Sequence, residues 1–182
     1  MKRLSWKVLV AIAIGVFAVG AIASLPRTMA QGGWQAAKSA PSSLIQQVAA
    51  ENVGSTSPID VSQMRVWKIR QSGQSVPLYL IDTRTTDPEN SAQANPLCGA
   101  LGCAFLGYLP GDEGYQQVLG IYLDPNLPPN IPLFQLSEAL HNELPILQVK
   151  QLEGHQIQQL TLTFNGQEYE VTQAELLSQR YE

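Results

Sequence analysis

The stretch QQLTLTFNGQEYEV, residues 158–171, has the clearest local structure signal in the chain. Asn165 and Gly166 form the strongest two-residue turn signal for a β-hairpin, because both residue types accept positive φ. A two-residue turn at this point places apolar residues opposite one another on one face and polar residues on the other. The predicted pairs are Leu162 with Tyr169, Leu160 with Val171, Thr163 with Glu168 and Thr161 with Glu170.

Other strand candidates lie upstream of this hairpin. Residues 76–83 (VPLYLIDT) are apolar at successive positions over 78–81, which is typical of a strand buried on both faces. Further strand candidates are residues 61–70, 103–109, 117–123 and 146–152, with a hairpin loop at 110–114 between the second and third of them.

Three segments have helical signals. They are residues 43–53, where Ser43 and Gln46 have capping-box spacing; the face of Leu136, Leu140 and Leu144, ended by Pro145; and a short C-terminal segment where Thr172 and Glu175 have capping-box spacing. The combination predicts an α+β fold, an antiparallel sheet of about 5–7 strands with two or three helices on one side.

The N-terminus has the features of an export signal. Residues 1–7 are basic, and residues 8–25 form an apolar run of 18 residues. Thr28 and Ala30 then supply small side chains at the −3 and −1 positions of a cleavage site. This pattern predicts a signal peptide cleaved between Ala30 and Gln31. The run also reaches the lower limit for spanning a bilayer, so an uncleaved signal anchor with membrane contact through residues 8–25 is the alternative. Either reading places the rest of the chain outside the cytoplasm.

The predicted organisation is a signal peptide or anchor at 1–30, a flexible linker at 31–41 and one α+β domain at 42–182. Residues 31–182 hold seven basic and all fifteen acidic residues, or about −8 with neutral histidines. An acidic balance argues against a nucleic-acid binder. Hydrophobic residues at 45% are sufficient for a packed core.

Cys98 and Cys103 are the only cysteines, and Gly99 and Gly102 free the backbone between them. Outside the cytoplasm this spacing predicts a structural disulfide. A redox-responsive pair is the alternative.

The sequence assigns no catalytic, cofactor-binding or metal-binding residue. His141 with Glu138 at helical spacing could supply half of a metal site, and His155 lies in a turn, but further ligands are missing. The remaining candidates are the carboxylates Asp82, Asp87, Glu89, Asp112 and Glu113 near strand ends, and the aromatic residues Trp34, Trp67 and Tyr108, which either stack on a ligand or lie in the core.

The chain resembles small exported cyanobacterial proteins of unknown function in its signal segment, in NPLCGALGCAFLGYLP (residues 95–110) and in LTLTFNGQEYEVT (residues 160–172). The resemblance implies a compartment, the periplasm or the thylakoid lumen, and no catalytic residue.

We therefore expect a non-catalytic extracytoplasmic module that binds a protein partner or assists assembly. The expected contact surfaces are the loops at 84–96, 98–103 and 124–132, because loops on a rigid sheet commonly carry recognition. The alternatives are a small enzyme, either a hydrolase or a thiol-dependent protein using Cys98 or His141, and a small-molecule or lipid carrier.

Overall fold

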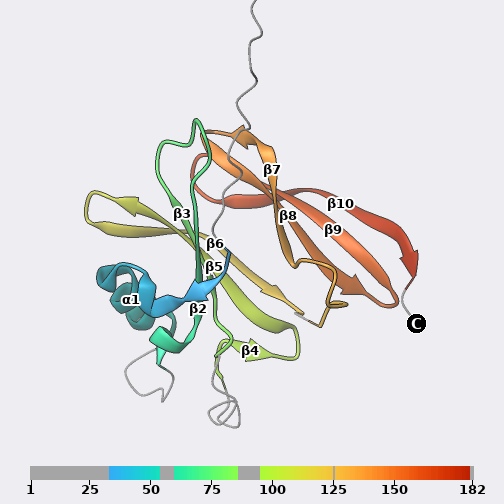
Figure 1. Ribbon diagram of the computed structural model, residues 1–182, viewed down its shortest axis with the longest axis horizontal. Helices are drawn as coiled ribbons and strands as arrows, with labels where there is room; N and C mark the ends of the chain where they lie inside the picture. The colour runs from blue at the N-terminus through green and yellow to red at the C-terminus, as the bar shows by residue number, and fades with distance from the viewer. Residues whose placement is uncertain (1–32, 54–59, 86–94, 125, 181–182) are drawn as a thin grey trace, which may run out of the picture.

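A computed structural model of the chain describes residues 33–53, 60–85, 95–124 and 126–180. Two antiparallel sheets make up most of the described chain, and one α-helix accompanies them (Figure 1). The predicted signal segment at 1–30, its apolar run at 8–25 and the junction of Ala30 and Gln31 lie outside the described residues.

Sheet A contains six strands in the order β1-β2-β3-β5-β4, and β6 pairs with β5. Their bounds are β1 (Gln35–Ala36), β2 (Arg65–Ile69), β3 (Leu78–Asp82), β4 (Cys98–Gly99), β5 (Gly102–Gly111) and β6 (Gly114–Leu123). The predicted hairpin around residues 110–114 is confirmed, with longer strands and a tight turn at Asp112 and Glu113.

Sheet B contains four strands in the order β10-β9-β8-β7. Their bounds are β7 (Phe134–His141), β8 (Leu144–Glu153), β9 (Gln156–Phe164) and β10 (Tyr169–Arg180). The proline-rich segment between the two sheets has no helix or strand over 126–133, because proline removes backbone donors and fixes φ.

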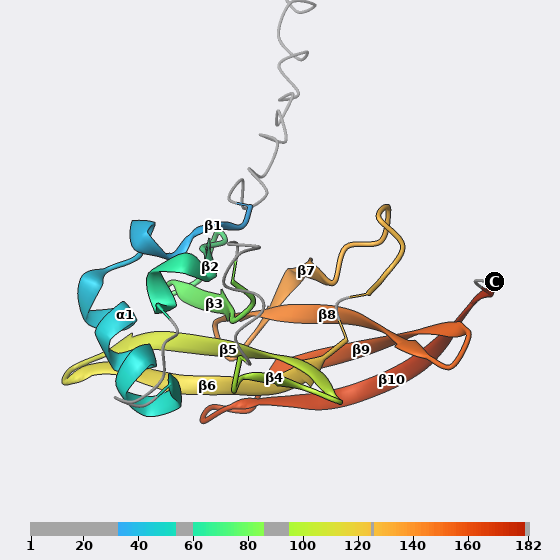
Figure 2. The ribbon, with the colours of Figure 1, turned by 90° about the horizontal axis from the view of Figure 1, so that it is seen from below.

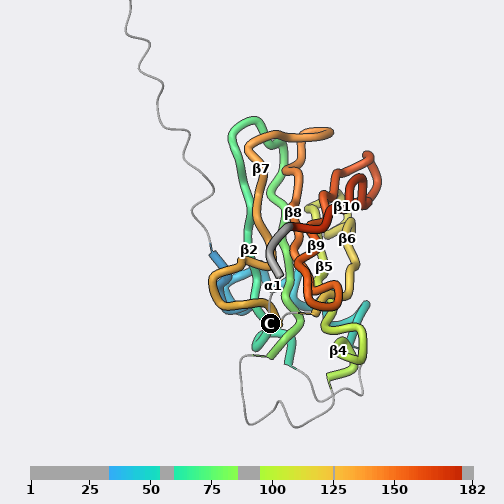
Figure 3. The backbone as a smooth tube through the Cα atoms, turned by 90° about the vertical axis from the view of Figure 1, so that its right-hand side faces the viewer, coloured from blue at the N-terminus to red at the C-terminus, as the bar shows by residue number. Residues whose placement is uncertain are grey.

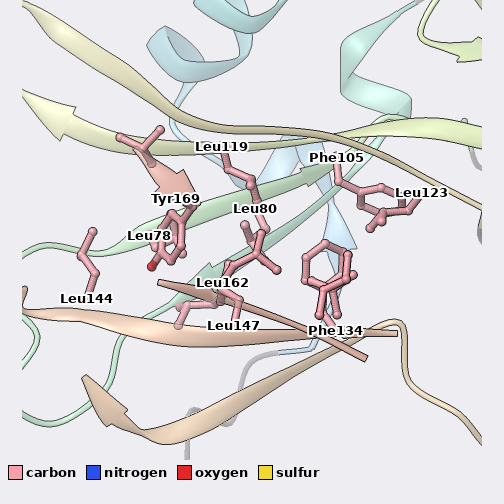
Figure 4. Packing of buried hydrophobic residues seen from close by; sticks show 14 of the residues in the cluster. Leu78, Leu80, Phe105, Leu119, Leu123, Phe134, Leu144, Leu147, Leu162 and Tyr169 are labelled. Atoms are coloured by element: carbon pink, nitrogen blue, oxygen red, sulfur yellow. The ribbon is translucent and has the colours of Figure 1, made fainter. Parts of the chain in front are cut away.

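β3 lies between two hydrophobic cores. All five of its residues are buried, as the run of apolar residues predicted. Leu78 and Leu80 point into the core between the two sheets, where they meet Leu147 and Leu162 of sheet B (Figure 4). Alternate side chains of a strand point to opposite faces, and Tyr79 and Ile81 accordingly belong to a second core on the other face of sheet A.

Helix α1 (Ser42–Val48) covers that second core, as Figure 2 shows, and confirms the helix predicted at 43–53. A π-helical turn, η2 (Ala49–Val53), continues it. The fully buried Tyr108 fastens this layer to the sheet: its hydroxyl donates to Glu51 at 3.0 Å and accepts from Asn52 at 2.8 Å. Burial raises the pKa of the Tyr108 hydroxyl well above its usual value.

The flexible linker predicted at 31–41 is wrong for the residues from Trp34 onward. Gln35 and Ala36 form β1 and pair with β2, and a 3₁₀ turn, η1 (Ala37–Ser39), follows. Ala37 is fully buried and its N–H donates to the carbonyl of Met64. The small side chain of Ala37 thus fits a packed core, so a run of small residues does not by itself indicate a flexible linker.

The helix predicted from Leu136, Leu140 and Leu144 is also wrong. Asn142 and Glu143 both have positive φ and form a tight turn that joins β7 to β8 as a hairpin. Residues four apart share a face of a strand as well as a face of a helix, and the register of this strand is irregular only between Leu136 and Leu140. The i, i+4 pattern was therefore ambiguous.

The hairpin predicted at 158–171 is confirmed, but its register differs by two residues. Phe164 pairs with Tyr169 and Leu162 with Val171, so four residues form the turn. The Asn165 side chain accepts from the backbone N–H groups of Gln167 and Glu168, which stabilises the wider turn. A shift of two residues keeps each side chain on its face.

The predicted C-terminal helix at Thr172 and Glu175 is wrong, because β10 continues through both residues. Thr172 occupies a bulge between Val171 and Gln173, and its hydroxyl donates to the carbonyl of Thr161. The hydroxyl thus bonds across the strands instead of capping a helix.

The α+β prediction holds in outline, since antiparallel strands are combined with a helix. The strands form two sheets instead of one, and α1 is the single α-helix among the described residues. In the described ranges, no helix has the length and apolar character needed to cross a membrane.

Replacement of Trp34 tests whether the N-terminal segment belongs to the domain. Trp34 packs against both Trp67 and Phe134. We expect Trp34→Ala to lower the free energy of unfolding by about 2–3 kcal/mol. The exposed neighbour Gln35 provides a control, and Gln35→Ala should change the free energy of unfolding by less than about 0.5 kcal/mol. Urea unfolding measures both. Equal stability of the two variants would contradict the packing described.

Candidate functional site

The cysteine pair closes a short hairpin at one end of the molecule. Cys98 pairs with Cys103 and Gly99 with Gly102, so β4 and β5 flank a turn at Ala100 and Leu101. The two sulfur atoms lie 2.10 Å apart, which is a bonding distance, and the predicted disulfide is therefore present in the structure. Leu101 at the tip of this turn is 79% exposed.

The three loops predicted as contact surfaces begin or end close together. A Cβ atom on Gly102 would lie 2.1 Å from the carbonyl oxygen of Leu123, so the disulfide turn sits against the start of the segment at 124–132. Asn95 donates to the carbonyl of Thr83 at 2.9 Å, which joins both ends of the loop at 84–96. We call residues 83–85, 95–103 and 122–124 the disulfide end; β4 marks its position in Figures 1 and 3.

A buried carboxylate borders the disulfide end. Asp82 is fully buried, whereas the side chains of Arg65 and Arg84 are each about one-third exposed. Arg84 donates to Asp82 through Nε at 2.8 Å and through Nη2 at 2.6 Å, and Arg65 donates to the same carboxylate. A buried charge needs such partners to offset its desolvation. Asp82 is therefore engaged as an ion-pair acceptor, and the three side chains together carry one net positive charge.

Both arginines contact aromatic rings. The ring of Trp34 lies 5.9 Å from Trp67 and 6.3 Å from Phe105, measured between centroids. The guanidinium carbon of Arg65 lies 5.6 Å from the Trp34 centroid, and that of Arg84 lies 5.6 Å from the Phe105 centroid. Such cation–π contacts limit the freedom of the arginine heads. Trp34, Trp67 and the buried Tyr108 therefore pack against protein side chains.

The histidine and carboxylate candidates that the structure describes are not brought together. His141 ends a strand, not a helix, and its Nδ1 lies 2.8 Å from the carbonyl oxygen of Phe164. His155 is exposed in the turn between β8 and β9, and Asp112 and Glu113 are exposed in the β5–β6 turn. Among the described residues, no three His, Cys, Asp or Glu side chains form a cluster that could hold a metal ion. Asp87 and Glu89 lie outside the described residues.

Four large hydrophobic side chains are strongly exposed in the described ranges, and they fall into two pairs. Leu101 (79%) and Tyr122 (51%) belong to the disulfide end, since Tyr122 pairs with Ala104 on the adjoining strand. Val171 and Leu176 both belong to β10. Sequence reasoning found the disulfide turn through its cysteines, but it missed Tyr122, because a strand pattern does not say which edge residue stays uncovered.

Replacement of Gly102 tests the close contact beneath the turn. Gly102 has φ +97°, and a Cβ there would collide with the backbone of Leu123. We expect Gly102→Ala to lower the free energy of unfolding by more than about 2 kcal/mol. Gly99 has no atom within 4 Å of the same position, so Gly99→Ala is the matched control and should have little effect. Thermal or urea unfolding distinguishes them; similar stabilities would contradict the predicted collision.

No family model, no curated protein and no solved structure matches the chain. Its function must therefore be inferred from its own residues.

Proposed function

We propose that the chain after residue 30 is a non-catalytic module that binds a protein partner outside the cytoplasm, in the periplasm or the thylakoid lumen. The basic and apolar N-terminal segment supports export. A disulfide between Cys98 and Cys103 fits export to an oxidising compartment, where disulfides persist. Assistance in the assembly of a membrane complex is one form that this binding takes if the N-terminal segment stays uncleaved.

The disulfide end is the proposed contact surface, and the exposure of Leu101 is the observation that carries the proposal. Leu101 projects from a turn that is held by a disulfide and by paired strands on both sides. Binding through a turn already fixed in shape loses little conformational entropy. Tyr122 and Arg84 lie at the same end, and aromatic and arginine side chains are enriched where interfaces hold most of their binding energy.

The export step has a direct test. We expect the native protein, isolated from cells that make the full chain, to have the intact mass of residues 31–182 less two hydrogen atoms. Intact-mass spectrometry before and after reduction checks both the cleavage after Ala30 and the disulfide. A measured mass equal to that of the full chain would instead indicate an uncleaved signal anchor. A mass unchanged by reduction would contradict the disulfide, and two freely reactive thiols would favour the thiol-dependent alternative.

Binding at the disulfide end is tested by replacing its exposed leucine. A C-terminally tagged full chain is produced in cells and recovered from a whole-cell extract in mild detergent, which retains both cleaved and uncleaved forms, and co-purifying protein is quantified. Loss of a central apolar anchor costs about 2 kcal/mol, or roughly thirtyfold in affinity. We therefore expect Leu101→Asp to abolish stoichiometric recovery of the partner. Ala139→Asp, the same kind of change at an exposed position of β7 that lies outside both proposed surfaces, is the control and should retain it. Absence of any stoichiometric partner, or equal recovery with both variants, would refute this surface.

A further inference from the structure

β10 is the edge strand of sheet B, and most of it is uncovered. It pairs only with β9 in the described part of the chain. Every residue from Glu170 to Leu176 is exposed, with Val171 at 50% and Leu176 at 54%. Figure 2 shows β9 and β10 continuing past the end of sheet A. The outer edge of β10 therefore presents backbone groups that no described strand uses.

One face of β10 continues the hydrophobic face of sheet B. Val171 lies opposite Leu162 and Ala174 lies opposite Leu160, both of which are buried in the core between the sheets. The bulge at Thr172 adds one residue, which keeps Ala174 and Leu176 on the same face as Val171. The exposed apolar side chains thus extend the core face sideways, beyond the part that sheet A covers.

The opposite face of β10 is acidic. Glu170 lies opposite Thr163 and Glu175 lies opposite Gln159, on the face turned away from sheet A. Their carboxylates accept only exposed contacts from Asn165 and Gln159, at 3.4 and 3.2 Å. No lysine, arginine or proline occurs between residues 169 and 177. Natural edge strands often carry lysine or proline, which discourages the addition of another strand.

We propose that β10 binds an extended peptide segment of a partner protein, in which apolar and basic residues alternate. The segment pairs with the free edge of β10 through backbone hydrogen bonds. Its apolar side chains then cover Val171, Ala174 and Leu176, and its basic side chains lie beside Glu170 and Glu175 on the other face. Alternate side chains of the bound segment point to opposite faces of the sheet, so its apolar residues meet the apolar face of β10 and its basic residues meet the acidic face.

Charge favours this occupant over a second copy of the chain. Two copies paired along β10 would place four glutamates on one face of the joined sheet, where like charges facing each other are destabilising. A basic segment converts the same glutamates into favourable cross-strand partners. This inference goes beyond the proposed function, because it assigns a different surface on the other sheet and states the chemistry of its partner.

Synthetic peptides added to the folded full chain test the proposal. The probes are an eight-residue peptide alternating valine and lysine, one alternating valine and glutamate, and one with the first composition but with its valines grouped. We expect the valine–lysine peptide to bind about tenfold more tightly than either of the others. It should also slow amide hydrogen exchange in β10, and not in β7 at the opposite edge. Unchanged exchange in β10, or equal binding of all three peptides, would overturn the proposal.

Charge reversal supplies the matched control. Glu170→Lys with Glu175→Lys should reverse the preference, so that the valine–glutamate peptide binds more tightly. Glu138→Lys with Glu143→Lys makes the same change in net charge at exposed positions of β7 and its turn, and should preserve the original preference. Circular dichroism confirms folding of each variant. A reversal by both double variants would show that net charge, not β10, decides binding. The peptide preference of β10 does not depend on Leu101. Whether or not Leu101→Asp loses its partner in the pull-down, the peptide experiment therefore tests β10 independently.

Discussion

The rest of the structure depends on the complete burial of β3. Its five residues have almost no exposed surface, and its two faces belong to different cores. A strand placed this way must be covered on both sides, so sheet B covers one face and helix α1 covers the other. The N-terminal segment follows from the same constraint, because Ala37 and Leu44 complete the core on the helix side. The domain therefore extends further towards the N-terminus than its composition indicates.

Burial of β3 also shapes the proposed binding surface. Asp82 ends the strand with a carboxylate that has no access to solvent, and an isolated charge there would be costly. Arg84 reaches back two residues to offset it, and Arg65 reaches across from the paired strand. These ion pairs hold both arginines in place next to the disulfide end. The same ion pairs that stabilise a buried strand end thus supply fixed cationic groups beside the disulfide turn.

Sequence patterns predicted the elements in which local chemistry and tertiary packing agree. The apolar run at 78–81, the helix from Ser43, the β5–β6 hairpin and the cysteine pair are of this kind. Errors arose where one pattern suits two structures. Leucines four apart fit a helix or a strand, and the outcome depended on Asn142 and Glu143 adopting a tight turn. Thr172 and Glu175 have the spacing of a helix cap, but pairing with β9 provides a different partner for the threonine hydroxyl.

The exposed surfaces were the least predictable part, because exposure depends on where each sheet ends. Val171 belongs to a pattern that predicts a buried face, yet half of its surface is accessible because sheet A does not extend over it. The charged residues are also distributed unequally between the two sheets. Arg65, Lys68, Arg70 and Arg84 belong to or adjoin β2 and β3 of sheet A, whereas β10 of sheet B has only acidic charged residues up to position 177. An acidic net charge therefore conceals a contrast between the ion-paired Arg65 and Arg84 beside the disulfide end and the acidic face of β10. A partner that suits one of these two surfaces by charge is disfavoured by the other, so the two surfaces are suited to different partners.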